Sequence, residues 1–341
     1  MADKSEKTET TVPTSYFEHP LAQSFKNDML EEGVDPKLID QVLRQATRRD
    51  SILEAISRPA EKTKEWFEYR KIFLDKNRID NGVRFLTKHK KIFDAVESQY
   101  GVPREIIAAI IGVETRYGKV VGSYRVIDAL ATLAFDYPKR SPFFRSELGH
   151  FLHIMASQNI DPASLKGSYA GAMGFGQFMP SSYRSYAVDF DSDSKVDIWK
   201  NKNDAIASVA NYLAKHGWLK NEKVATQVEW LINEDKSIQA AMQDERFNQL
   251  KLPSVKASEL EDLNLSIELS KSNVKRKFPS IVDAVSDTEL FQPYFLVQKD
   301  NVEAWLASSN FYVITRYNHS HLYAMAVFQL SQEILSGYDS Q

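Results

Sequence analysis

The stretch GVPREIIAAIIGVETRYG, residues 101–118, decides most of what the sequence says about the fold. Pro103 suits the first turn of a helix, and the apolar run after it predicts a buried helix that continues toward the final glycine. Glu114 ends this run, on the same face as the isoleucines three, four and seven residues before it. Burial against hydrocarbon raises the pKa of a carboxyl, which is how a glutamate becomes a general acid near neutral pH. The alternative is a structural ion pair between Glu114 and Arg116 or another base.

Helical patterns continue on both sides of this stretch. Apolar spacing and cap signals predict helices at 36–46, 87–100, 126–135, 142–157, 205–217 and 323–335. Beyond about residue 220, the segments ATQVEWLI, LNLSIEL and YFLVQ have the alternation or β-branched content of short strands. The expected fold class is therefore mainly α (α+β), with a small sheet before the final helical segment.

The composition excludes several classes of function. The 341 residues carry a formal net charge of -3, which does not suit a nucleic-acid binder, and the length predicts two domains or three compact subdomains. The chain has no cysteine, so disulfides, thiolate metal sites and lipid attachment through cysteine are excluded. Neither HExxH nor GxSxG occurs, which argues against a zinc peptidase and a serine hydrolase of those types.

The start of the chain, MADKSEKTETTVPTS, is polar and reads as a tail. It lacks the apolar core of a secretory signal, and no stretch approaches the roughly 18 apolar residues of a membrane span. We therefore expect a protein that is soluble as written, either naturally or because a leader was removed.

The segment KGSYAGAMGFGQF, residues 166–178, is crowded with glycine and small residues. Such a composition predicts a turn-rich segment that borders a cleft.

The acidic segment DFDSDSKVDIWK, residues 189–200, resembles a calcium-binding loop. Oxygen donors at loop positions 1, 3, 5, 7 and 9 would come from Asp189, Asp191, Asp193, the carbonyl of Lys195 and Asp197. The segment departs from the EF-hand rule because Ser194 replaces the turn glycine and Lys200 replaces the bidentate glutamate. Asp204 could supply the missing ligand, or it could only cap the helix that follows. A solvated acidic loop is the alternative to a metal site.

With these segments assembled, the sequence resembles the B-type lytic murein transglycosylases, in their soluble form. The segments that carry the resemblance are YRKIF (69–73), GVPREIIAAIIGVETRYG (101–118), DALATLAFDYP (128–138), LKGSYAGAMGFGQFMPSSYRSYAVDF (165–190), DAIASVANYLAKHGW (204–218) and FYVITRYNHSHLYAMAV (311–327). The likeness covers nearly everything from about residue 20 onward.

The resemblance implies a lysozyme-like core flanked by a helical domain and a small β domain. The expected division is a disordered tail 1–18, a helical domain 19–100, a catalytic core 101–218 with an EF-hand-like loop 189–204, a small β-containing domain 219–305, and a C-terminal segment 306–337 that returns to the core or helical domain.

The resemblance also implies a mechanism. Glu114 would protonate the oxygen between N-acetylmuramic acid and N-acetylglucosamine in peptidoglycan, and then act as base on the C6 hydroxyl, giving 1,6-anhydromuramyl ends. The substrate's own acetamido group would replace the second carboxylate of an ordinary glycosidase. Residues expected to line the glycan cleft are Tyr69, Ser168, Gln177, Tyr212, Tyr317 and Tyr323.

Further expectations follow from the same resemblance. The chemistry would need no cofactor, and a structural Ca²⁺ would be held by Asp189, Asp191, Asp193, Lys195 and Asp204. The partners would be peptidoglycan strands and other cell-wall enzymes, with no nucleic acid and no transmembrane segment, in the periplasm. One alternative is a hydrolytic muramidase with a second carboxylate such as Asp128, Asp136 or Glu147. The other is a noncatalytic peptidoglycan-binding scaffold protein.

Overall fold

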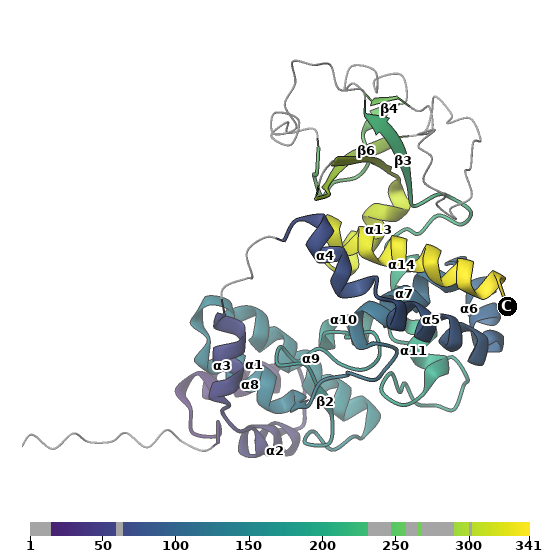
Figure 1. Ribbon diagram of the computed structural model, residues 1–341. Coiled ribbons are helices and arrows are strands. Elements are labelled where there is room, and N and C mark those ends of the chain that lie inside the picture. Colours follow the sequence, from purple (N-terminus) through teal and green to yellow (C-terminus); the bar gives the residue numbers. More distant parts are fainter. Residues whose placement is uncertain (1–14, 59–63, 231–246, 257–264, 267–289, 300–301) are drawn as a thin grey trace, which may run out of the picture. The chain divides into compact units, whose positions relative to one another are not determined.

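The computed structural model describes residues 15–58, 64–230, 247–256, 265–266, 290–299 and 302–341 (Figure 1). The chain divides into two compact units. Unit 1 comprises residues 1–58 and 121–185, and unit 2 comprises residues 59–120 and 186–341. Each unit is therefore built from two separate stretches of sequence.

Unit 1 is helical. Its helices are α1 (Pro20–Glu31), α2 (Pro36–Gln45), α3 (Asp50–Ser57), α8 (Val126–Asp136), the 3₁₀ turn η1 (Pro138–Arg140), α9 (Ser141–Gln158) and the start of α10 (Pro180–Tyr186). Residues 126–135 of helix α8 are all buried, and the helix packs against α9, α2 and α3. A short antiparallel pair, β1 (Tyr124–Arg125) with β2 (Lys166–Gly167), precedes the glycine-rich segment.

The predicted tail, 1–18, lies mostly outside the described residues. Tyr16, near its end, is only 3% exposed and donates a hydrogen bond to Asp136. This contact ties the chain to helix α8 before the first helix begins.

Unit 2 has helices α4 (Trp66–Phe73), α5 (Lys76–Lys88), α6 (Lys90–Tyr100), α7 (Arg104–Thr115), α11 (Lys202–Lys215), α13 (Ser309–Tyr317) and α14 (His321–Asp339). Helix α7 packs against α5, α6, α11 and α14, and its residues 106–112 are all buried. The apolar run of the opening segment is therefore the centre of this unit, as predicted.

The sheet of unit 2 is antiparallel, with strand order β4-β6-β7-β3-β5. The strands are β3 (Ala225–Trp230), β4 (Val255–Lys256), β5 (Leu265–Ser266), β6 (Leu290–Val297) and β7 (Val302–Ala307). Phe291, Phe295 and Leu306 belong to its apolar core. Phe247 stacks on Phe295 with ring centroids 4.2 Å apart.

The predicted helices and strands are largely confirmed, with differences at their ends. The segment predicted as one helix, 87–100, is broken at His89, which ends α5 and begins α6. The helix predicted toward residue 118 ends at Thr115, because Arg116 adopts a left-handed backbone with φ of 51°. The predicted strand LNLSIEL is described only at Leu265–Ser266.

Among the described residues, no helix combines the length and the apolar character needed to cross a membrane.

Candidate active site and acidic loop

Glu114 lies in the last turn of α7 and is partly exposed. Its carboxyl Oε1 accepts a hydrogen bond of 2.7 Å from the hydroxyl of Tyr323 on α14. Burial raises the pKa of Glu114 to about 7, although the bond from Tyr323 acts in the opposite direction. The predicted raised pKa is thus confirmed, and the alternative ion pair with Arg116 is wrong because Glu114 is paired with a neutral phenol.

Three tyrosines lie within electrostatic reach of Glu114. Burial raises the pKa of Tyr69, Tyr317 and Tyr323, and the negative charge of Glu114 raises each of them further. These phenols stay neutral at physiological pH, so they place no negative charge beside the carboxyl. Tyr69 and Tyr317 are partly exposed, whereas Tyr323 is only 2% exposed.

Tyr212 extends this aromatic group from α11. Its ring packs edge-to-face against Tyr317, with centroids 4.7 Å apart, and stacks on His216 at 4.1 Å. Its hydroxyl donates to the backbone oxygen of Arg316 at 2.6 Å, and burial raises its pKa to about 12. Tyr212 therefore supports Tyr317 with its ring and anchors the end of α13 with its hydroxyl.

The loop after Glu114 is fixed by an unusual backbone. Arg116, Tyr117 and Gly118 have φ of 51°, 60° and 83°, three successive left-handed residues of which only the last is glycine. The hydroxyl of Tyr117 donates to the backbone oxygen of Arg78 at 3.0 Å. That bond ties the loop to helix α5.

Two glycines make room for the Tyr117 side chain. A Cβ atom at Gly82 would lie 2.6 Å from the Tyr117 hydroxyl oxygen, and one at Gly112 would lie 2.5 Å from it. Glycine on α5 and glycine on α7 together leave the notch into which Tyr117 inserts. This arrangement holds the last turn of α7, and with it Glu114, against α5.

Ser168 and Gln177 belong to unit 1, in the glycine-rich segment. The hydroxyl of Ser168 accepts from the backbone N–H groups of Ala170 and Ala172, at 3.2 and 3.0 Å. Gln177 has φ of 51°, and its amide nitrogen donates to the backbone oxygens of Gly174 and Val121. Antiparallel bridges at Met173 make the segment a series of tight turns, as its composition predicts.

The three carboxylates considered as a second catalytic group all have structural partners in unit 1. Asp128 is 1% exposed and accepts bonds from Arg125, Arg49 and the backbone N–H of Thr47.

The other two are engaged in the same way. Asp136 is bonded to Tyr16 and Arg48. Glu147 accepts from the backbone N–H and the hydroxyl of Ser181, at 2.9 and 2.7 Å, at the start of α10. Each of the three therefore holds parts of unit 1 together.

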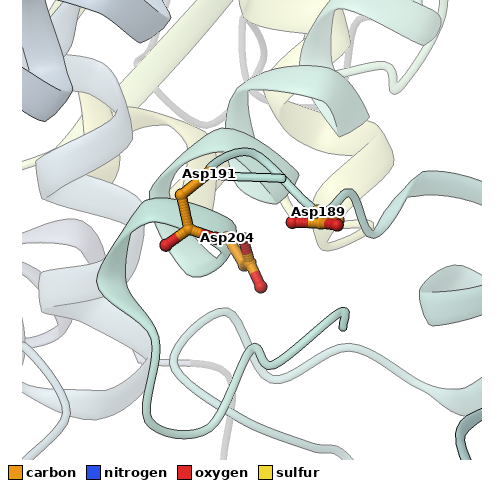
Figure 2. A group of neighbouring side chains, drawn as sticks. All are labelled: Asp189, Asp191 and Asp204. Atoms are coloured by element: carbon orange, nitrogen blue, oxygen red, sulfur yellow. The ribbon is translucent and has the colours of Figure 1, made fainter. Parts of the chain in front are cut away.

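The acidic loop brings Asp189, Asp191 and Asp204 together, with one carboxylate oxygen of each within 4.8 Å of the others (Figure 2). Three carboxylates are donors that a hard cation such as Ca²⁺ prefers, so the residues present fit a calcium ion. Asp193 is outside this group and accepts from the backbone N–H of Lys195 at 2.9 Å.

Asp204 organises the loop. Its two oxygens accept from the backbone N–H groups of Phe190 and Asp197, both at 2.8 Å, and the residue is fully buried. Burial raises its pKa, and the charges of Asp191 and Asp189 add to that shift. The alternative role of Asp204 as a helix cap is wrong, because Asn201 caps α11.

Glu105, in the first turn of α7, also has its pKa raised to about 7 by burial, but of the two it is Glu114 that accepts a bond from a tyrosine. A helical core with a proton-retaining glutamate beside tyrosines is typical of one class of protein, the lysozyme-like enzymes that cleave glycan chains. The family model described as Transglycosylase SLT domain matches residues 17–332. The chain belongs to this family, the lytic murein transglycosylases, and is an enzyme that acts on peptidoglycan.

Relatives agree with this assignment along nearly the whole chain. Membrane-bound lytic murein transglycosylase B of Escherichia coli (strain K12) is 38% identical over 329 residues, which is 94% of this chain and 84% of the relative. The crystal structure of soluble lytic transglycosylase SltB1 from Pseudomonas aeruginosa shares 43% identity and has a TM-score of 0.82, covering 94% of this chain and all of that one. The predicted family and the mainly α, lysozyme-like fold are confirmed.

Two further structures contain bound molecules. Escherichia coli lytic transglycosylase Slt35 in complex with calcium is 37% identical, with a TM-score of 0.80, covering 94% of this chain and 95% of that one. SltB3 from Pseudomonas aeruginosa in complex with NAG-NAM-pentapeptide is 29% identical, with a TM-score of 0.78, covering 95% of this chain and 80% of that one.

Sequence reasoning missed the residues that hold Glu114 in place. Tyr117 was read only as part of a motif, and nothing in the sequence shows that its hydroxyl reaches Arg78, 39 residues earlier. Gly112 is a glycine inside a predicted helix, and such positions often have a packing reason. No helix is predicted around Gly82, which lies in α5. A glycine inside a helix is the one sequence feature that points to this packing.

Proposed function

We propose that Glu114 acts first as general acid and then as general base in cleaving the β-1,4 bond between N-acetylmuramic acid and N-acetylglucosamine, with formation of 1,6-anhydromuramyl ends. The single observation that carries this proposal is the position of Glu114, which accepts a bond from Tyr323 at 2.7 Å and has its pKa raised to about 7 by burial. A carboxyl with that pKa can both give and take a proton near neutral pH. One group can then serve both steps.

The proposal needs no second carboxylate. The pKa of Glu114 is shifted by burial and by Tyr323, with no carboxylate of the described residues contributing. Asp128, Asp136 and Glu147 are engaged with structural partners. This supports a substrate-supplied nucleophile over the hydrolytic muramidase alternative, in which a free carboxylate activates water.

The tyrosines near Glu114 have two proposed roles. Tyr69 and Tyr317 are partly exposed, so their rings are suited to contact sugar faces. Tyr212 and Tyr323 are buried, so they act through their neighbours: Tyr212 through Tyr317, and Tyr323 through its bond to Glu114. Ser168 and Gln177 are proposed to contact the glycan from the glycine-rich segment of unit 1.

The acidic loop is proposed to hold a structural Ca²⁺ through Asp189, Asp191 and Asp204, with Asp193 and the carbonyl of Lys195 as further ligands. The ion would supply positive charge that links the loop to the first turn of α11, and the reaction itself would need no cofactor. The calcium complex of Slt35 and the grouped carboxylates support this proposal.

The substrate is proposed to be a peptide-bearing glycan strand in the periplasm, since SltB3 was solved with NAG-NAM-pentapeptide. Contacts with other cell-wall enzymes are a further part of the proposal. The division into a tail, a helical domain, a catalytic core, a small β domain and a C-terminal segment also stays a prediction.

Analysis of the products by mass spectrometry tests the proposed reaction. Wild-type protein acting on purified sacculi should release fragments with anhydro ends, and Glu114→Gln should release none. Reducing ends in place of anhydro ends would support the hydrolytic alternative. Full activity of Glu114→Gln would remove Glu114 from the mechanism, and Asp128→Asn is the comparison for loss of a structural carboxylate.

A further inference from the structure

A group of four basic side chains lies in unit 2, outside the contacts of Glu114. We call this group the cationic cradle; it consists of Arg78 and Arg84 on α5 and of Arg116 and Lys119 on the loop after α7. Arg84 Nη2 and Lys119 Nζ both donate to the amide oxygen of Asn81, at 3.0 and 3.1 Å. Two positive charges therefore share one neutral oxygen atom.

The cradle has little negative charge to balance it. Among the residues that the structure describes, Arg84, Arg116 and Lys119 form no ion pair, and all three are exposed. The nearby Asp80 is already paired with Lys76 at 2.8 Å. Like charges held close together repel each other, so an anion bound between them would be favoured.

Arg78 is the buried member of the cradle. It is 5% exposed, and its Nε and Nη1 atoms have no hydrogen-bond partner in the described part of the chain. Its nearest carboxylate, that of Asp75, is 3.8 Å from Nε, beyond hydrogen-bond distance. The charge of Arg116 lowers the pKa of Arg78, in addition to the effect of burial, so the two guanidinium groups are neighbours.

The backbone on which Arg78 and Arg116 stand is fixed, and it adjoins Glu114. The Tyr117 hydroxyl holds the backbone oxygen of Arg78, and Arg116 follows Glu114 by two residues. The Arg78 guanidinium lies over the ring of Phe73, 5.1 Å from its centroid, so it adds fixed positive charge behind the exposed members of the cradle. Arg84, Arg116 and Lys119 supply the exposed N–H donors that can bind a carboxylate. The backbone of Arg78 is already held in place without a ligand, so binding would cost little backbone conformational entropy.

We propose that the cationic cradle binds carboxylate groups of the peptides carried by the glycan strand. This inference rests on the proposed function, in which the muramyl sugar is held at Glu114. A pentapeptide attached to that sugar ends in a carboxylate and is confined near the cradle, so even a weak contact gains from high effective concentration. The cradle would thus favour cleavage of strands that still carry peptides.

The test compares two substrates and two double variants. Arg84→Gln with Lys119→Gln removes two charges from the cradle without touching Glu114. Lys91→Gln with Lys215→Gln removes two exposed charges from other helices of unit 2 and is the matched control. The kcat/KM for anhydro-product release is measured on peptide-bearing strands and on strands stripped of peptide by an amidase.

The cradle variant should lower the ratio of kcat/KM on peptide-bearing strands to kcat/KM on stripped strands by about two- to twentyfold, as expected for two partly exposed ion pairs. The loss should shrink as salt is raised. The control variant should leave the ratio as in wild type. An equal loss of kcat/KM on both substrates would overturn the proposal. So would a cradle variant whose ratio of the two kcat/KM values equals that of the control variant.

A binding experiment separates failure of this proposal from failure of the proposed reaction. Fluorescence anisotropy with a labelled acidic pentapeptide, free of sugar, is measured on Glu114→Gln with and without the cradle substitutions. The intact cradle should bind the peptide more tightly than its C-terminal amide. Equal binding by both proteins would refute carboxylate recognition, and so would displacement of the peptide by inorganic phosphate at equal concentration. Neither result depends on cleavage.

Discussion

Replacing Glu114 by glutamine should stabilise the protein in a pH-dependent way. Burial holds the pKa of Glu114 at about 7 in the folded chain, against an ordinary value of 4.5. The folded protein therefore keeps a proton that the unfolded chain releases between pH 4.5 and 7. Glu114 should therefore lower the free energy of unfolding of the wild type by about 3 kcal/mol across this window, since each pH unit contributes about 1.4 kcal/mol. Glu105, whose pKa burial also raises to about 7, adds a fall of its own, which is common to the wild type and the Glu114 variant.

Glutamine does not ionise, and its side-chain oxygen can still accept the bond from Tyr323. Glu114→Gln should therefore match the wild type near pH 4.5 and exceed it by up to about 3 kcal/mol at pH 8. Urea unfolding of the full chain at both pH values measures the difference. The exposed Glu222→Gln in the same unit is the control and should show no such pH dependence. A glutamine variant that is no more stable than wild type at pH 8 would refute the raised pKa.

Three further outcomes are expected. Tyr323→Phe removes the bond that lowers the pKa of Glu114, so the basic limb of the pH profile of kcat/KM should move to higher pH. An unmoved limb would contradict that role of Tyr323. Gly112→Ala should lower the free energy of unfolding by about 1–3 kcal/mol by displacing Tyr117. Its combination with Tyr117→Phe should cost less than the sum of the two changes. Strict additivity in urea unfolding would refute the contact between Tyr117 and Gly112. Ca²⁺ should raise the melting temperature of the wild type but not that of Asp204→Ala. The variant also loses two hydrogen bonds from backbone N–H groups, so each protein is compared with itself with and without Ca²⁺. Equal shifts in melting temperature would exclude Asp204 as a ligand.

The sequence predicted what depends on local pattern. The isoleucine-rich face of α7 and the position of Glu114 at its end follow from helical periodicity, and both are found. The hydroxyl that contacts Glu114 comes from Tyr323, 209 residues later, and only the packing of α14 on α7 brings it there. Residue spacing alone holds no information about such a contact. The resemblance to a known family did single out Tyr323, but not its bond.

Strand β7 and the start of α11 show two other limits. The segment VEAWLA of β7 contains two alanines. It pairs with the preceding strand β6 on one side, but its central place in the sheet depends on β3, which lies far earlier in the chain. Asp204 was read as a possible cap because a helical pattern follows it. The helix begins earlier, at Lys202, because Asn201 accepts the capping bond and frees Asp204 to organise the acidic loop.

The insertion of Tyr117 between Gly82 and Gly112 has a consequence for protein engineering. Helix α7 and its glutamate cannot be transplanted alone, because the turn after the helix is held by Gly82 and by the backbone oxygen of Arg78, both on α5. A transplant into another scaffold must carry α5 as well. Lengthening the turn by a single residue would pull Tyr117 from its notch and release the end of the helix that carries Glu114.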